Sequence, residues 1–440
     1  MTMVTLATVP TDALPRPSKR KNDEDVRPSD TKVAKRKTAL STESLARNQP
    51  GASKRRAINQ APTQRLHAYV CGDVSAGELG LGPRIKKAKR PYINPHLSGA
   101  VQVAVGGMHA LALTHDNQIL SWGVNDMGAL GRDTTWDGGL VDIDDQSVES
   151  DDEMNPLEST PAAIPKACFP ENTVITQVAA ADSCSFALTE DGSVYGWGTF
   201  RVSVLFSPFL RTKIDITKDN EGCVGFAFDK QRQLIKVQRT PTRLPMLTGI
   251  TQIACGSNHA LALDKLGRVY AWGNGQQNQL GRRILERTRM QALVPCKVSI
   301  PRTKIVSVGC GSYHSFAIDQ NGDVWGWGIN SHGELGIPTQ EDNEASRSIA
   351  PPQRVESLRG KRLESVQGGS NHSVGVTSNG ECFVWGRADG GQCGLDVKSL
   401  PDDSVVRDMR GNVRMVSVPT VIPGKPCLLE QSSSQQLTSF

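Results

Sequence analysis

The sequence predicts an all-β protein, a β-propeller of tandem repeats, from three observations. These are a recurring Trp-Gly pair, a hairpin pattern before each pair, and a glycine nine residues after the Trp. Each pair stands 13 residues after a His or Cys, while the interval between pairs varies from 55 to 75 residues. Spacing that is fixed within units and variable between them indicates an internal repeat. The pairs begin at Trp122, Trp197, Trp272, Trp327 and Trp385, and the preceding residues are His109, Cys184, His259, His314 and His372.

Residues 250–273 illustrate the elements that each unit predicts. A β-branched stretch at 250–253 leads to a corner of small residues at 254–259, and alternating apolar residues follow at 260–263. A turn that contains Gly267 then joins this strand to the next one, which carries Trp272. Alternation on both sides of a glycine-containing turn indicates a β-hairpin. One antiparallel unit cannot bury both of its faces, so we expect small four-stranded sheets in a ring.

A glycine follows the tryptophan at a fixed step, which indicates a backbone position with φ > 0 or a close approach. Four of the five units keep this step, and an N-terminal half-unit repeats it between Cys71, which stands where Trp would, and Gly80. The strand of the half-unit, residues 66–72, is expected to pair with a strand from the C-terminal end, but no such strand is evident in the sequence. The four glycines are Gly131, Gly281, Gly336 and Gly394.

Residues 1–66 are expected to form a disordered basic tail, because they combine positive charge with little apolar content. The net charge of +5 conceals this concentration of basic residues in the first 56 positions. Two of the clusters have the arrangement of a nuclear-import signal, and the same charges suit phosphate backbone or acidic histone surfaces. The alternative is a solvated tail without a partner. The import candidates are Lys19, Arg20, Lys21, Lys35, Arg36 and Lys37.

Composition excludes several classes of protein. No run of 18 apolar residues is present and the N-terminus lacks the features of a secretory signal, so no membrane contact is expected. The ten cysteines include no C-x-x-C pair, which indicates a reducing compartment and no zinc site. No phosphate-binding loop, zinc-protease motif or serine-nucleophile motif is present, so we expect neither a cofactor nor a catalytic site. An acidic run inside a surface insertion at 132–160 does not match a Ca²⁺ loop, so no metal is expected.

The repeat resembles that of the regulator of chromosome condensation family over roughly residues 67–425. The shared motifs are Gly-x-x-His, Trp-Gly and Gly-x-Leu-Gly, the last as in 333–336 and, with Asn at its first position, in 278–281. Stretches at 197–201, 238–241, 272–282 and 385–389 are similar to the family's fungal nuclear members. The resemblance implies a seven-bladed propeller in the nucleus that promotes GDP release from the small GTPase Ran on chromatin and supports nucleocytoplasmic transport. It implies Ran, chromatin and a nuclear import receptor as partners.

The chain departs from the family's pattern at two places. Residues 202–220 fall where the family has a short hairpin, and because Val202-Ser203 is what an in-frame 5′ splice site would encode, we hypothesise retained intron sequence. After residues 418–420 the family continues with a further repeat, whereas this chain has a polar segment at 426–440. We therefore expect a propeller that is incomplete in its last blade.

Residues that recur in every unit are expected to be scaffold, so the exceptions within a shared column are the site candidates. Asp182 carries the only charge in the column two residues before the His. The family resemblance implies GTPase contacts at these corners and a β-wedge after Arg201. The contact candidates are Asp182, Asn258, Asn371 and His372, and the wedge candidates are Arg201, Glu221, Gly222, Gly225 and Phe226. The alternatives are turn capping by these Asp and Asn residues, a chromatin platform without exchange activity, and a propeller enzyme.

Overall fold

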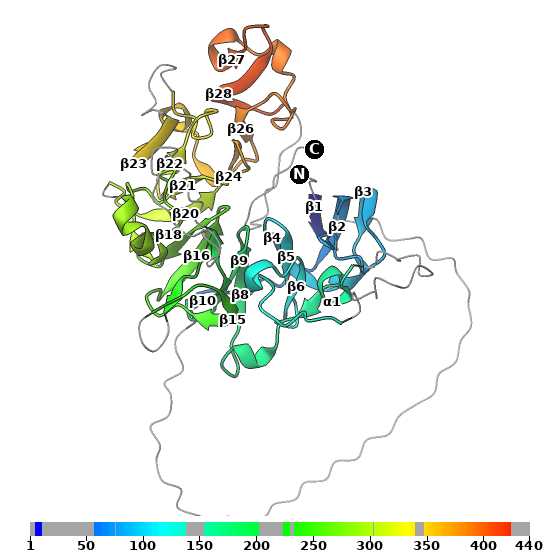
Figure 1. Ribbon diagram of the computed structural model, residues 1–440. Coiled ribbons are helices and arrows are strands. Elements are labelled where there is room, and N and C mark those ends of the chain that lie inside the picture. The colour runs from blue at the N-terminus through cyan, green and yellow to red at the C-terminus, as the bar shows by residue number, and fades with distance from the viewer. Residues whose placement is uncertain are drawn as a thin grey trace, which may run out of the picture.

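The computed structural model describes residues 5–10, 57–74, 76–137, 154–201, 223–228, 233–301, 303–338 and 347–423. Within these ranges six main sheets follow one another along an arc (Figure 1). The helices in the same ranges are short, and none has the length and apolar composition to cross a bilayer. They are α1 (Pro156–Ser159), η2 (Pro95–Leu97), η3 (Asp126–Gly128), η4 (Lys166–Cys168), η5 (Glu286–Leu293), η7 (Glu356–Leu358), η8 (Val397–Ser399) and η9 (Asp402–Ser404).

Four of the sheets contain four antiparallel strands that pair in chain order. The first has β4 (Ala100–Val105), β5 (His109–Thr114), β6 (Ile119–Gly123) and β7 (Ala162–Ala163). The second has β8 (Ile175–Ala180), β9 (Cys184–Thr189), β10 (Val194–Gly198) and β15 (Gln238–Arg243). The third has β16 (Ile250–Cys255), β17 (His259–Asp264), β18 (Val269–Gly273) and β19 (Cys296–Lys297). The fourth has β20 (Ile305–Cys310), β21 (His314–Asp319), β22 (Val324–Ile329) and β23 (Ser348–Arg354). The predicted hairpins are therefore confirmed, and so is the all-β propeller class.

The sheets at the two ends of the arc differ from this plan. The last sheet runs β24-β25-β26-β28-β27, and the first has three strands in the order β1-β2-β3. Strand β2 pairs antiparallel with β1, with Thr5 opposite Cys71. The strand of the half-unit thus takes its partner from the N-terminal segment, not from the expected C-terminal strand. The bounds are β1 (Thr5–Pro10), β2 (Leu66–Asp73), β3 (Lys87–Ile93), β24 (Leu363–Gly368), β25 (His372–Thr377), β26 (Cys382–Arg387), β27 (Val405–Arg407) and β28 (Val413–Val421).

Several predicted segments lie wholly or partly outside the described residues. These are 11–56 of the expected tail, 138–153 of the acidic insertion, the 202–220 insertion and the 426–440 segment. Strand β1 lies inside the 1–66 segment, for which no structure was expected. The gap after Arg201 separates the paired strands β11 (Phe200–Arg201) and β12 (Cys223–Val224), and a second small pair, β13 (Ala227–Phe228) with β14 (Leu234–Ile235), follows it.

The Trp-Gly pair is explained by the register of each hairpin. His259 lies opposite Gly273, and the same pairing recurs in the other units, including Cys184 opposite Gly198. Gly273 has φ +114°, and a Cβ atom there would stand 2.5 Å from the carbonyl oxygen of Asn258. Only glycine fits a position that combines this backbone conformation with such a close contact.

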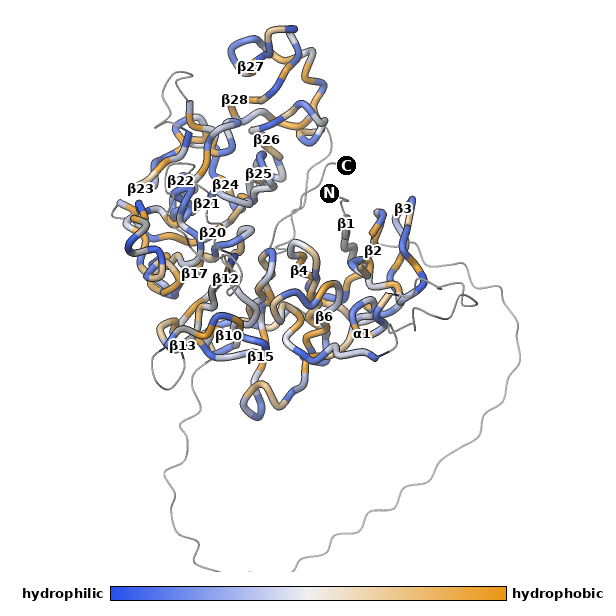
Figure 2. The backbone as a smooth tube through the Cα atoms, in the orientation of Figure 1, coloured by the Kyte–Doolittle hydropathy of each residue, from blue (hydrophilic) through white to orange (hydrophobic). Residues whose placement is uncertain are grey.

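The core lies between consecutive sheets. Each repeated tryptophan is fully buried at such a junction, and the apolar clusters combine residues of two neighbouring sheets, as Phe186 and Trp272 do. Figure 2 shows hydrophobic stretches repeating along the strands from sheet to sheet, while β3 is largely hydrophilic. Consecutive sheets therefore bury their facing surfaces against one another, which is the physical basis of a propeller.

Candidate functional site

The corners before the His column form one continuous rim. The backbone N–H of Asp182 donates to the carbonyl of Ser257 at 2.8 Å, Ser257 donates to Ser312 at 3.1 Å, and Ser312 donates to Gly369 at 3.0 Å. These bonds link four sheets in series, from β8–β15 to β24–β28. The expected corner positions therefore lie on the same side of the arc.

Asp182 is a half-buried carboxylate without a cationic partner among the described residues. Burial raises the pKa of Asp182, and a hydrogen bond from the Ser257 side chain opposes that rise. The Asn258 amide approaches the carboxylate, with Nδ2 3.5 Å from Oδ2. Burial and the charge of Asp182 together raise the pKa of Tyr313 on the next corner. An uncompensated carboxylate of this kind can accept a basic side chain from outside the chain.

Asn258 connects this carboxylate to the hairpin arm after Arg201. Its Oδ1 accepts the backbone N–H of Arg201 at 2.8 Å, and the arginine carbonyl faces Asn274 Nδ2 at 3.5 Å. The guanidinium of Arg201 forms an ion pair with Asp126 of the preceding unit. Asp182, Asn258 and Arg201, which sequence reasoning proposed separately, are thus joined in one cluster. Asn258 is 9% exposed, so its amide is available mainly to Arg201 and Asp182 and little to solvent.

The remaining wedge candidates lie at the root of the arm or outside the described residues. Phe226 is 3% exposed and packs on Phe186 and Phe200, with ring centroids 5.4 and 5.6 Å away. A Cβ atom on Gly225 would stand 1.5 Å from the carbonyl oxygen of Ile235. These two residues therefore anchor the arm in the core. Glu221 and Gly222 lie outside the described residues.

Asn371 and His372 lie on the same rim in the last sheet, beyond the Ser312 to Gly369 link. The Asn371 carbonyl accepts the N–H of Arg387 at 2.8 Å, and His372 is 7% exposed. They do not join the cluster of Asp182, Asn258 and Arg201. Sequence reasoning did not select two other rim residues, Met108 and Tyr313, whose side chains are 45% and 38% exposed. The signal was available, since both are large residues in a column otherwise occupied by Ser and Asn.

The recurring His and Trp residues form hydrogen-bonded ties between sheets. His259 Nε2 lies 2.9 Å from Ser315 Oγ of the next sheet, and that hydroxyl donates to the Gln279 carbonyl at 2.9 Å. Trp327 Nε1 donates to the same carbonyl at 2.9 Å. Burial lowers the pKa of His259 to about 3, so the ring is neutral in the folded protein. His109 and His314 start equivalent ties, with Ser185 and Ser373 of the following sheets.

Known proteins share this repeat along most of the chain. The RCC1-like domain family matches residues 67–432. Protein pim1 of Schizosaccharomyces pombe is 40% identical over 415 residues, which cover 92% of this chain and 70% of pim1. The guanine nucleotide exchange factor SRM1 of Saccharomyces cerevisiae is 38% identical over 377 residues, which cover 82% of this chain and 73% of SRM1.

Solved structures agree with this match. The crystal structure of Prp20p from Saccharomyces cerevisiae, described with its binding to Gsp1p and histones, has a TM-score of 0.69 at 36% identity and covers 84% of this chain and 76% of its own. The structure of Kap60 bound to yeast RCC1 (Prp20) has a TM-score of 0.68 at 35% identity, with 88% of this chain and 81% of that chain covered. The chain therefore belongs to the RCC1-like domain family, that of the regulators of chromosome condensation.

Proposed function

We infer that this chain is a guanine-nucleotide exchange factor for the small GTPase Ran, and that it acts without covalent chemistry. The observation that carries the proposal is the cluster of Asp182, Asn258 and Arg201, which joins a rim carboxylate that has no cationic partner among the described residues to the root of a hairpin arm. Similarity to SRM1, a named exchange factor, gives the cluster its context.

The mechanism is one of differential binding. A GTPase that holds nucleotide at picomolar affinity has about 16 kcal/mol of binding free energy, so spontaneous release is slow. The Asp182 carboxylate would accept a basic side chain of the GTPase, while Asn258 holds the arm in register with it through the Arg201 N–H. The arm would then disturb the phosphate and Mg²⁺ contacts. By linkage, if the exchange factor lowers the affinity of the GTPase for nucleotide by some factor, nucleotide lowers the affinity of the GTPase for the exchange factor by the same factor.

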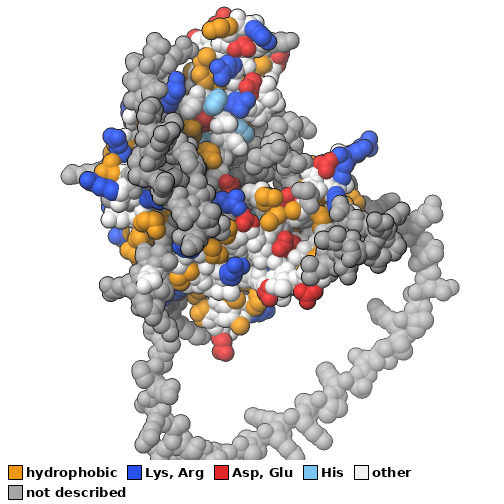
Figure 3. Space-filling model, in the orientation of Figure 1, with side chains coloured by type: hydrophobic (Ala, Val, Ile, Leu, Met, Phe, Trp, Pro, Cys, Tyr) orange, Lys and Arg blue, Asp and Glu red, His pale blue; other side chains and the backbone are white. Residues whose placement is uncertain are grey.

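The basic tail would serve chromatin binding, nuclear location and the import receptor. Prp20p is described as binding Gsp1p and histones, and Kap60 is bound to Prp20 in the second structure. Ile58 and Asn59 donate their N–H groups to the Glu190 carbonyl, just past the end of β9 opposite to Asp182. The tail would thus leave from the rim that the GTPase does not occupy. Further Lys and Arg side chains gather at the tip of the first sheet (Figure 3).

The second candidate is a chromatin platform without exchange activity. The observation that favours it is the length of the interruption, since residues 202–222 separate the two strands of the arm. The two functions predict different results with Ran loaded with a fluorescent GDP.

Exchange activity should accelerate release of that GDP at micromolar protein. Asp182→Asn should slow the accelerated release about tenfold or more without lowering the unfolding midpoint, as the loss of one charge-assisted contact does. Asp403→Asn, on an exposed turn far along the chain, is the matched control and should behave like the parent. Release no faster than the intrinsic rate would leave the platform as the function.

A further inference from the structure

The indole N–H of the repeated tryptophan is normally bonded to the preceding sheet. Trp122 donates to the Glu78 carbonyl at 3.1 Å, and Trp197 donates to Ala129 at 2.8 Å. Trp385 donates to Glu334 at 2.7 Å, like Trp327 with Gln279. The acceptor is always the second residue of the Gly-x-Leu-Gly type motif that ends nine residues after the previous unit's Trp or, in the half-unit, Cys71.

The last glycine of that motif lies against the same indole. Gly80 and Gly131 have φ of +65° and +66°, and a Cβ atom on either would come within 2.8 Å of the ring. Gly281 and Gly336 take the same backbone conformation, at φ +67° and +64°, with the ring 3.4 Å from such an atom. The motif therefore covers the indole ring and also accepts the hydrogen bond from its N–H.

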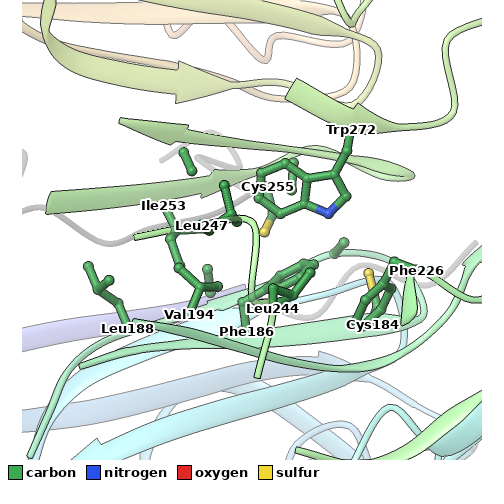
Figure 4. Close-up of a cluster of buried hydrophobic side chains, with 14 of the residues drawn as sticks. Cys184, Phe186, Leu188, Val194, Phe226, Leu244, Leu247, Ile253, Cys255 and Trp272 are labelled. Carbon is green, nitrogen blue, oxygen red and sulfur yellow. The ribbon is translucent and has the colours of Figure 1, made fainter. Parts of the chain in front are cut away.

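Trp272 is the exception. It is fully buried, yet its Nε1 finds no acceptor among the described residues. Its ring packs edge-on against Phe186 with centroids 5.6 Å apart. Figure 4 shows its nitrogen on the side of the ring that faces Cys184 and Phe226. A buried donor without an acceptor costs about 1–3 kcal/mol, so this indole N–H destabilises the junction unless an acceptor reaches it.

The unit before Trp272 contains the motif that supplies the acceptor in other units, but at a later position. The run Gly-Cys-Val-Gly at 222–225 fits the motif, but it starts 25 positions after Trp197, whereas the motif starts six positions after each of the other tryptophans. Its last residue, Gly225, has no positive φ and meets the carbonyl of Ile235 in place of an indole. The run is nevertheless close, because Phe226 packs on Phe186 and Phe186 packs on Trp272.

We propose that Trp272 is a positioning residue for the hairpin arm, and that its indole N–H donates to the Cys223 carbonyl when the arm is seated. The bond is open in this structure. Arg201 is already held by Asn258 and Asn274, which belong to the same sheet as Trp272. The third tie would fix the second strand of the arm to the sheet that holds the first. The functional consequence rests on the proposed exchange activity, in which the arm acts on the GTPase.

The test compares Trp272→Phe with the matched control Trp327→Phe, because both remove an indole N–H and leave a similar ring. In the full chain, Trp327→Phe should raise the unfolding equilibrium constant about fivefold to tenfold, as expected for one buried hydrogen bond. Trp272→Phe should raise it at least about threefold less than Trp327→Phe, because both changes remove the same ring area and only Trp327 loses a hydrogen bond. In a variant that lacks residues 202–220, Trp272→Phe should become as costly as Trp327→Phe. Equal costs of the two changes in the full chain, or a neutral Trp272→Phe in the deletion variant, would overturn the proposal.

Two further measurements test the proposal independently of the stability comparison. In the full chain labelled with ¹⁵N-tryptophan, the Trp272 indole proton should exchange with solvent at least tenfold faster than that of Trp327, and equal protection would contradict an open bond even if the deletion variant does not fold. In the deletion variant, GDP release from Ran should be faster than with the full chain, and Trp272→Phe should reduce that gain. If no variant releases GDP, the proposed function fails while the stability comparison still decides the tie.

Discussion

Two neighbouring junctions between sheets solve the same packing problem with different chemistry. At the regular junction, between β16–β19 and β20–β23, His259, Ser315 and Trp327 converge on the carbonyl of Gln279. At the interrupted junction, between β8–β15 and β16–β19, Cys184 replaces the histidine and Ala260 replaces the serine. The regular junction is a hydrogen-bonded tie and the interrupted one is an apolar contact.

The substitutions at the interrupted junction are matched to one another. A Cβ atom on Gly256 would stand 2.0 Å from the ring of His259, so the histidine requires glycine three residues earlier. Where Cys184 stands, the residue three earlier is Ala181, because a thiol needs less room. The side chains of Phe186, Phe200 and Phe226 fill the junction with aromatic contacts. This difference shows that the histidine column is replaceable scaffold, and that loss of its polar tie is offset by aromatic packing.

Among the changes that test this comparison, Phe226→Ala should have the largest effect on the free energy of unfolding. If aromatic packing replaces the polar tie, removing a ring that is 3% exposed should lower the free energy of unfolding by about 3–5 kcal/mol. Urea unfolding followed by tryptophan fluorescence measures the loss. Tyr92→Ala, at an aromatic side chain that is 54% exposed, is the control and should change the value by less than about 0.5 kcal/mol. A loss for Phe226→Ala below about 1 kcal/mol would mean that the arm's root is not part of the core.

The second prediction concerns pH, which should act on the regular junction alone. The pKa of His259 is about 3 in the folded protein, below its ordinary value of 6.5, because burial disfavours the charged ring. Between these values the unfolded chain binds a proton that the folded chain does not, so stability is full above pH 6.5 and falls as pH decreases. The slope is about 1.4 kcal/mol per pH unit for this residue.

Urea unfolding at pH 7, 6 and 5 checks this slope in the parent and in His259→Ala. The variant should be less stable at pH 7 but should lose less stability on acidification. His96→Ala, at an exposed histidine, is the control variant. Identical slopes for the parent and His259→Ala would show that the ring can be protonated in place. Cys184 offers no group that titrates in this range, because burial raises the pKa of its thiol well above the ordinary value.

The repeat and its exception at Cys184 could be predicted from the sequence, but the contacts that distinguish the two junctions could not. The fixed step from His or Cys to Trp predicted the hairpins, and the exception at Cys184 was visible in the same column. Pairing of β2 with β1 was not predictable, because it joins segments about 60 residues apart without a local pattern. The tie from Asn258 to Arg201 was not predictable either, since it joins two sheets through a side chain. Burial of Phe226 could have been inferred, because phenylalanines are concentrated in the one unit that lacks the histidine.

The smallest expected effect comes from restoring the hydroxyl that the interrupted junction lacks. Ala260 is fully buried and occupies the place of Ser315, so Ala260→Ser would bury a hydroxyl in the apolar cluster that contains Cys184. The change should lower the free energy of unfolding by about 1 kcal/mol, because no acceptor replaces the one in water. Combining it with Cys184→His and Ala181→Gly rebuilds the regular arrangement and should recover at least about 0.5 kcal/mol relative to the sum of the separate changes. If the free energies of the three changes simply add, the interrupted junction lacks its polar tie because Trp272 has no acceptor carbonyl, and not because the histidine is absent.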